Sequence, residues 1–506
     1  MKVLKGLIAA ATLASMMTGT AFAAQNVVNV AIVGEPDTMD PMMSTKDVVS
    51  IVTQHFYETL FTFNSKFEVV PLLAETMPTI SDDGKSYSIS IRQGITFHDG
   101  STMDAHDVAD SLNRWVKTAS RGKGVADKID SISASDDFTV MIKMNTAYSP
   151  LLSLLAFSNS AAVVYPQENI GEDISAVVGT GPYKLEAHKP DQYIQLVKFD
   201  NYVSRDEPSD GGSGARTQSM DEIRFIPVPD SNTRVEGILS GQFDFADGLP
   251  VEAIKRLEAS DKAEPMVLRP FGWPIFAFNH KDGLNTNLHI RLAVQAALNE
   301  DDMLFAAFGD DAFFVTDGPL YPEGWFWRTD AGASAYNVHD ADAAAGHLKA
   351  AGYDGTPLRI LTSHQYEFHF KLAEVAKVNL EAAGFKVKLD VVDWATLGQR
   401  RNNPELWDIY ITHSPFIAEP ALNSMYSPTS RLGWKDAEKE AILAEFTSVS
   451  DPEQRKVLFS KLQEKVFEQV PFIKIGGFNA LLGKSSKLNG VTKTPWPFFW
   501  NATIDD

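Results

Sequence analysis

The chain has 506 residues, with 45 lysines and arginines against 66 aspartates and glutamates, and its formal net charge is −21. An acidic balance of this size argues against nucleic acids and anionic membrane surfaces as partners. The absence of cysteine excludes disulfides, thiol nucleophiles and thiolate metal sites, as well as the lipidated cysteine that tethers some exported proteins to a membrane. The length predicts two to four domains with ample core.

The first residues have the composition of a secretory signal peptide. Lys2 and Lys5 precede an apolar run over residues 7–17, and Ala21 and Ala23 supply small residues where a signal peptidase cleaves. This run is too short to cross a bilayer, and no later run of 18 apolar residues follows it. We therefore expect residues 1–23 to be a signal peptide, and the rest of the chain to be a free protein in a Gram-negative periplasm.

The first predicted strand ends in a turn-rich loop. Residues 27–33 are apolar and β-branched, and the following residues 34–41 are rich in glycine, proline and aspartate. In α/β folds the groups that meet a ligand lie just beyond the carboxyl ends of strands. Met39 and Asp40 occupy such a place, so both are candidate ligand-binding residues.

Turns and a capped helix account for a dense group of histidines and aspartates. Residues 87–91 and 95–97 predict two short strands separated by turns. Asp104 is placed to cap a following helix, whose apolar residues share one face. The side chains of metal-binding type in this region are His98, Asp99, Asp104, His106 and Asp107. We interpret them as turn and cap residues and expect no metal site.

Residues 358–416 carry the clearest pattern in the chain, which reads strand, helix, strand, helix, strand. The strand candidates are residues 358–362, 385–391 and 406–411, and Gly384 stands where a helix ends with a C′ glycine. Two consecutive β-α-β units predict a parallel sheet with right-handed crossovers, and therefore an α/β fold. The residues beyond the strand ends are candidate ligand contacts: Trp394, His413, Ser414 and Phe416.

Several separated blocks resemble one family. Residues 81–87, 91–100 and 105–112 read SDDGKSY, IRQGITFHDG and AHDVADSL, and they are similar to the signature of the family 5 extracellular solute-binding proteins. Further similar blocks follow in the expected order, with GTGPY at 179–183, GQFDF at 241–245, FAFN at 276–279 and RLAVQAAL at 291–298. Members of this family are the dipeptide, oligopeptide and nickel binding components of ABC importers.

The resemblance implies a two-lobe fold of the periplasmic-binding-protein type II kind, with an extra subdomain inserted in the first lobe. On this layout lobe I takes residues 24–269, with the insertion at about 60–171. Lobe II takes residues 270–471, and residues 472–506 return to lobe I. Two crossing strands would form the hinge. Trp273 lies close to the predicted crossover, so it is a further candidate ligand contact.

The resemblance also implies the function. It predicts periplasmic capture of a solute, with peptides as the first expectation, and delivery to inner-membrane ABC permease subunits with their ATPases. It implies a monomer that needs no cofactor and has no enzymatic activity.

One departure from the family pattern keeps other solutes open. Peptide-binding members carry an aspartate shortly after the corresponding strand, where it pairs with the free amino group of the ligand. Here residues 413–420 read HSPFIAEP, with Glu419 as the only acid. An opine, an oligosaccharide or a chelated metal are therefore alternatives. Nearby Arg400 and Arg401 can hold a carboxylate, although two adjacent arginines after a helix usually form a solvated face. In another class the alternative is a secreted hydrolase, although the chain has no Gly-x-Ser-x-Gly or His-Glu-x-x-His motif.

Overall fold

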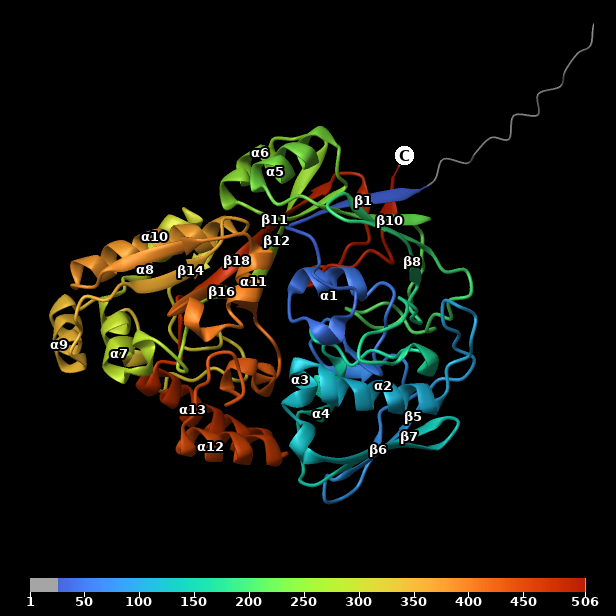
Figure 1. Ribbon diagram of the computed structural model, residues 1–506. Helices are drawn as coiled ribbons and strands as arrows, with labels where there is room; N and C mark the ends of the chain where they lie inside the picture. Colours follow the sequence, from blue (N-terminus) through green and yellow to red (C-terminus); the bar gives the residue numbers. More distant parts are fainter. Residues whose placement is uncertain (1–25, 506) are drawn as a thin grey trace, which may run out of the picture.

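The computed structural model describes residues 26–505 and shows two lobes side by side (Figure 1). The predicted signal peptide, residues 1–23, lies outside the described residues. The lobes contact each other in this conformation, since the backbone N–H of Ser149 donates to the carbonyl oxygen of Thr447 over 2.8 Å. No helix among residues 26–505 is long and apolar enough to cross a membrane.

One sheet of twelve strands runs through both lobes and joins them. Its strands are β1 (Val27–Ile32), β8 (Tyr183–Lys189), β9 (Tyr193–Lys198), β10 (Glu222–Pro227), β11 (Phe245–Leu249), β12 (Ala263–Phe278), β13 (Phe314–Val315), β14 (Leu358–Thr362), β15 (Val387–Val391), β16 (Ile409–Pro415), β17 (Phe472–Lys474) and β18 (Gly477–Ser485). The order across the sheet is β15-β14-β16-β12-β18-β11-β1-β10-β9-β8, with β13 beside β18 and β17 beside β12.

The predicted β-α-β-α-β unit is confirmed. β14 pairs in parallel with β15 along its whole length and with β16 at Ile360 and Leu361, and the connections are α10 (Glu367–Ala382) and α11 (Trp394–Arg400). The third strand begins later than predicted, because Asn403 caps a short 3-10 helix by accepting the N–H of Glu405. It runs on to Pro415 because it pairs with β12 over its full length.

β12 and β18 are the strands that cross between the lobes. The part of β12 up to Leu268 pairs with β18, whereas the part from Gly272 onward pairs mainly with β16 and β17. The pairing register shifts between Leu268 and Gly272, beside the lobe boundary predicted at 269/270. β17 lies against the second part of β12, and β18 pairs with the first part. The lobe limits themselves stay predictions.

The second part of β12 shows why the lobe II sheet is buried on both faces. Phe276 and Phe278 belong to the larger apolar cluster of the molecule, whereas Trp273, Ile275 and Ala277 belong to a second cluster on the opposite face. Successive side chains of a strand point to opposite faces, so an unbroken apolar run fits a strand that is covered on both sides.

A smaller sheet and one helix occupy the region of the signature hairpin. The sheet has the order β4-β5-β7-β6. These elements are β4 (Thr79–Ile80), β5 (Ser86–Ser90), β6 (Ile129–Asp136), β7 (Thr139–Met144) and α2 (Ala105–Thr118). Asp104 caps α2 as predicted, because its carboxylate accepts the N–H groups of His106 and Asp107 at 2.7 and 3.2 Å. The strand predicted at 95–97 is wrong: the turn that follows folds Phe97 back onto Ser101, and only a single bridge forms there.

The remaining helices pack on these sheets or on one another (Figure 1). They are α1 (Asp47–Thr53), α3 (Ser120–Lys123), α4 (Leu151–Ala156), α5 (Ser231–Ser240), α6 (Ile254–Glu258), α7 (Leu288–Ala297), α8 (Glu300–Phe308), α9 (Ala341–Ala351), α12 (Ala437–Ser448) and α13 (Pro452–Gln469). Two short strand pairs complete the fold: β2 (Phe61–Phe63) with β3 (Val69–Pro71), and β19 (Leu488–Asn489) with β20 (Thr503–Ile504).

Candidate ligand-binding cleft between the lobes

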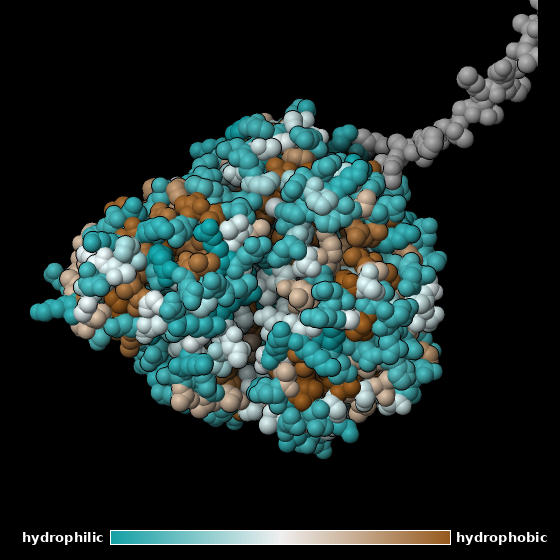
Figure 2. Space-filling model, in the orientation of Figure 1, coloured by the Kyte–Doolittle hydropathy of each residue, from teal (hydrophilic) through white to brown (hydrophobic). Residues whose placement is uncertain are grey.

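A cavity of about 850 Å³, here called the large cavity, lies between the lobes. Lobe I lines it with residues from the start of α1, the predicted insertion and the C-terminal segment, which include Lys46, Asp47, Arg121 and Trp496. Lobe II lines it with residues around α11 and β16, which include Trp394, Arg401, His413, Ser414 and Arg431. Figure 2 shows the seam along which the two lobes meet. A solute in the large cavity therefore contacts both lobes.

Trp394 reaches the large cavity because it begins α11, directly after the carboxyl end of β15. Asp393 caps this helix by accepting the N–H of Thr396 over 2.8 Å, and the N–H of Trp394 donates to the side-chain oxygen of Gln365. The indole ring lies 5.1 Å from the ring of Tyr366 and is stacked 6.3 Å from that of His413. These contacts hold a half-buried aromatic wall in place.

His413 presents a neutral ring to the same cavity. Its Nδ1 lies 3.0 Å from Nε2 of His369. Burial lowers the pKa of His413 to about 3, and burial with the neighbouring His413 lowers the pKa of His369 well below its usual value. Both rings are therefore uncharged at neutral pH, and one of them donates its N–H to the other.

Asp47 is the one carboxylate among the residues that line the large cavity. It accepts hydrogen bonds from Nε1 of Trp496 at 2.8 Å and from Nδ2 of Asn159 at 3.5 Å. Burial raises the pKa of Asp47, and these two hydrogen bonds act in the opposite direction. The carboxylate is thus fixed by two groups that lie far from it and from each other in the sequence.

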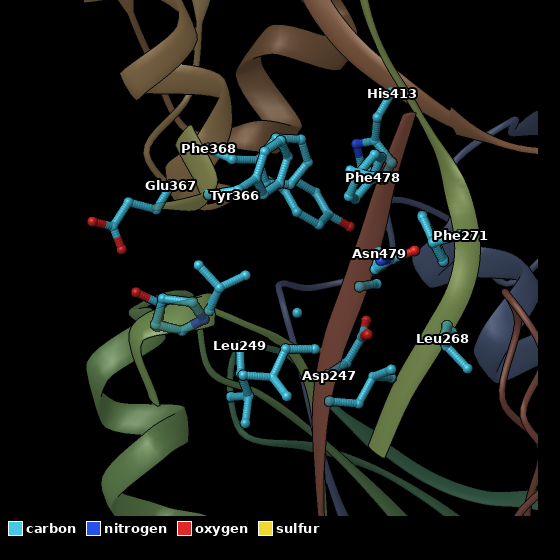
Figure 3. A pocket seen from close by; sticks show the side chains of 18 of the residues that line it. Asp247, Leu249, Leu268, Phe271, Tyr366, Glu367, Phe368, His413, Phe478 and Asn479 are labelled. Atoms are coloured by element: carbon cyan, nitrogen blue, oxygen red, sulfur yellow. The ribbon is translucent and has the colours of Figure 1, made fainter. Parts of the chain in front are cut away.

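A second cavity of about 800 Å³, the apolar cavity, adjoins the first at Asp47, Tyr366 and His413, which line both. Figure 3 shows its labelled wall residues, most of them apolar: Leu249, Leu268, Phe271, Tyr366, Phe368 and Phe478. Nζ of Lys371 in α10 lies 2.7 Å from Oε1 of Glu252 in a 3-10 helix, η4 (Val251–Ala253), and both residues line this cavity. Burial raises the pKa of Asp247, which also lines it, to about 6.

A third cavity, of about 300 Å³, contains Trp273 and Phe416 in its lining. Ser414, Pro415, Ile417 and Asn423 line both this side cavity and the large cavity. The side cavity is thus a neighbour of the cleft on the lobe II side.

Comparison with known proteins gives the family. Residues 68–436 match the model of the bacterial extracellular solute-binding proteins, family 5 middle. The chain belongs to this family. It is 25% identical to the probable peptide ABC transporter periplasmic-binding protein y4tO of Sinorhizobium fredii, over 95% of this chain and 94% of that protein. It is 26% identical to the glutathione-binding protein GsiB of Pectobacterium atrosepticum, over 97% of this chain and 96% of that protein.

A solved structure supports the same fold. The periplasmic binding protein DppA of Helicobacter pylori, in complex with the peptide STSA, aligns with a TM-score of 0.84 and 22% identity, over 95% of this chain and 98% of that chain. The predicted two-lobe α/β fold and the predicted family are therefore confirmed.

In this family 5 solute-binding protein the predicted site residues fall in different places. Trp394, His413 and Ser414 line the large cavity, and Trp273 and Phe416 line the side cavity. Met39 and Asp40 line none of the three cavities. The buried carboxylate of Asp40 instead accepts hydrogen bonds from Nη2 of Arg114 and from the hydroxyl of Tyr165, each at 2.7 Å.

Glu419 does not replace the aspartate of the peptide-binding family members. Its carboxylate receives two hydrogen bonds from Arg455, at 2.7 and 2.9 Å, and a third from the N–H of Ala421. It lines none of the three cavities. Asp47 is the carboxylate that the large cavity offers to an amino group.

No local sequence pattern identifies several of the lining residues as candidate ligand contacts. Asp47 and Trp496 are 449 positions apart, and each looks locally like an ordinary helix or loop residue. Arg401 is different, because the pair Arg400–Arg401 is able to hold a carboxylate, although two adjacent arginines after a helix usually form a solvated face. The structure separates the two arginines: Arg401 lines the large cavity, whereas Arg400 is exposed and lines none of the three cavities.

Proposed function

We propose that this solute-binding protein captures a small peptide in the periplasm and delivers it to ABC permease subunits in the inner membrane. The observation that carries the proposal is the large cavity, because both lobes build its walls. A solute held there gains all its contacts only when the lobes are closed, so binding shifts the population toward the closed form. The permease then recognises that form.

The edge of β16 supports a peptide as the solute. β12 covers one edge of β16 as far as Pro415, whereas β14 pairs with the other edge at Ile409 and Tyr410. Within residues 26–505 no strand continues this second edge beside residues 411–415. An extended peptide can add to such an edge through main-chain hydrogen bonds. The relatives named as a peptide-binding and a glutathione-binding protein support the same solute class.

The lining of the large cavity supports binding without a chemical step. The Ser414 hydroxyl donates to the carbonyl oxygen of Pro415 at 3.1 Å, and His413 pairs with His369. Nucleophilic catalysis needs a hydroxyl in hydrogen-bond contact with a base, and this arrangement does not supply that pair. We therefore propose that the solute leaves the protein unaltered.

Native mass spectrometry of protein released from its own periplasm by osmotic shock tests this proposal. We expect the released protein to begin near residue 24 and to carry an adduct with the mass of a small peptide. Glutathione is the first peptide to add to solute-free protein as a probe. Calorimetry with the identified peptide then gives the affinity, and the recovered peptide keeps its mass. An adduct with the mass of an opine, a sugar or a metal complex would contradict the peptide assignment. A recovered peptide that is cleaved would support a hydrolase instead.

A further inference from the structure

The large cavity contains more positive charge than its own residues neutralise. Four cationic side chains line it, Lys46, Arg121, Arg401 and Arg431, against the single carboxylate of Asp47. The charge of Lys46 is neutralised by a residue that does not line the cavity, because its Nζ lies 2.9 Å from Oδ2 of Asp37. Within the described part of the chain, none of the three guanidinium groups has a carboxylate oxygen within 4.0 Å.

Arg121, on the lobe I side, is held by neutral groups. Its Nε donates to the carbonyl oxygen of Asn159 at 2.9 Å, its guanidinium lies 4.2 Å from the ring centre of Phe157, and it also donates to the carbonyl oxygen of Leu422 in lobe II. Burial lowers its pKa to about 10, with Asp47 acting in the opposite direction. Arg121 is therefore still a cation at neutral pH, and it lines the large cavity.

Arg401 and Arg431 lie together on the lobe II side. Nε of Arg401 is buried with no hydrogen-bond partner among the described residues, and its guanidinium lies 5.9 Å from the ring centre of Tyr410. Nε of Arg431 donates to the neutral side chain of Asn402 at 2.7 Å. Burial, and then the like charge of Arg431, lower the pKa of Arg401 to about 10. Asp37 and Asp47 act in the opposite direction from beyond 4.0 Å, so the two cations repel each other and neither has a carboxylate in direct contact.

We propose that the solute carries at least two carboxylates, one for the Arg401–Arg431 pair and one for Arg121. Removing a charge from water is unfavourable unless an opposite charge replaces the water, and guanidinium groups bind carboxylates through paired hydrogen bonds. Asp47 is then left to meet a free amino group. The solute class is an acidic peptide, with more carboxylates than amino groups. This inference rests on the proposed function and specifies its solute.

Two pools of tripeptides that differ only in charge test the proposal. One pool contains peptides with glutamate at any position, and the other contains the matching peptides with glutamine, which has nearly the same shape. Solute-free protein is mixed with both pools together, and native mass spectrometry reads the peptides that stay bound. We expect the glutamate peptides to be enriched tenfold or more over their glutamine partners, with an enrichment that declines as salt is added.

Neighbouring arginines provide the matched variants. Arg401→Gln is expected to reduce the enrichment at least tenfold, whereas Arg400→Gln, an exposed change one residue away, leaves it within twofold. In the absence of peptide, Arg401→Gln is expected to be at least as resistant to urea as the parent protein, because it removes a desolvated cation. A merely structural role for Arg401 predicts the opposite, a loss of stability.

The possible results distinguish the acidic-solute proposal from the proposal of peptide capture. Equal retention of both pools, or preference for glutamine or basic peptides, overturns the acidic-solute proposal and leaves peptide capture standing. Retention of neither pool contradicts peptide capture, and the acidic-peptide proposal falls with it. An enrichment that survives in Arg401→Gln removes this arginine from the site.

Discussion

Nζ of Lys371 and Oε1 of Glu252 lie 2.7 Å apart, so an ion pair joins α10 of lobe II to η4 of lobe I beside the apolar cavity. Its partners belong to different predicted lobes, so we expect the pair to form only when the lobes are together. Side-chain exposures of 24% and 56% indicate a solvated pair, for which about 0–1 kcal/mol is typical. Lys371→Gln is therefore expected to weaken solute binding about two- to fivefold, as measured by calorimetry at low salt, because it disfavours the closed form.

An ion pair inside lobe I is the control for this prediction. Arg256 and Glu236 lie 2.8 Å apart and are both exposed, so Arg256→Gln removes a similar pair without touching the second lobe. Its affinity for the solute should match that of the parent protein. Equal affinities for Lys371→Gln and Arg256→Gln would show that the pair between the lobes does not bias closure.

Trp394 is expected to be a direct solute contact. Its half-buried ring lines the large cavity, so Trp394→Ala should weaken binding tenfold or more, which is about 1.4 kcal/mol. Trp394→Phe keeps an aromatic wall and should recover part of the affinity. Phe326→Ala removes an exposed ring outside the three cavities and serves as the control. Unchanged calorimetric affinity in a folded Trp394→Ala protein would remove this residue from the site.

Asp40 is expected to support lobe I rather than bind solute. Its carboxylate pairs with Arg114, whose side chain is only 4% exposed, so Asp40→Ala leaves a buried cation without a counter-charge. Loss of such a partner costs about 3–5 kcal/mol, and urea unfolding should show it. The exposed residue Asp261 gives a neutral comparison as Asp261→Ala. If the milder Asp40→Asn folds and loses solute affinity tenfold, Asp40 acts as a ligand contact after all.

The two central histidines are expected to stay uncharged over the physiological pH range. The pKa of His413 is lowered to about 3 and that of His369 is also lowered, so neither ring should titrate between pH 5 and 8. A lowered folded-state pKa contributes stability above the unfolded value near 6.5, and this contribution is lost as pH falls from there toward about 3. NMR signals of the two rings, assigned with His413→Gln and His369→Gln, check this. A midpoint near 6.5 for either ring would show that it is solvated.

Strand and helix patterns in the sequence predict those residues of the candidate site that lie at the ends of regular strands. The strand periodicity of residues 358–362 and 385–391 fixes a parallel pair, and Trp394 follows from its position directly after the second of these strands. His413 and Ser414 were expected beyond a strand end, but they lie inside β16, near its carboxyl end, because the strand runs on to Pro415. Their place in the cleft needed only the rule that parallel strands present ligand contacts at their carboxyl ends.

The other residues of the candidate site are placed by contacts between residues that are far apart in the sequence, and the periodicity of the sequence does not predict such contacts. Asp40 follows a strand just as Trp394 does. Its carboxylate is nevertheless buried in lobe I, where it accepts a hydrogen bond from Arg114, which is 74 positions away. Asp47 enters the large cavity beside Trp496, at the other end of the chain. The charge imbalance of the cavity likewise appears only when Arg121, Arg401 and Arg431 are seen on the same walls.

The central claim is that two lobes close over an intact solute, and small-angle X-ray scattering tests it most directly. The protein is freed of solute by unfolding and refolding, and then measured alone and with a saturating amount of the peptide identified by mass spectrometry. We predict a smaller radius of gyration with peptide, and a scattering curve that agrees with the conformation in Figure 1, in which Ser149 contacts Thr447. Superimposable curves from the solute-free and the saturated protein would contradict closure.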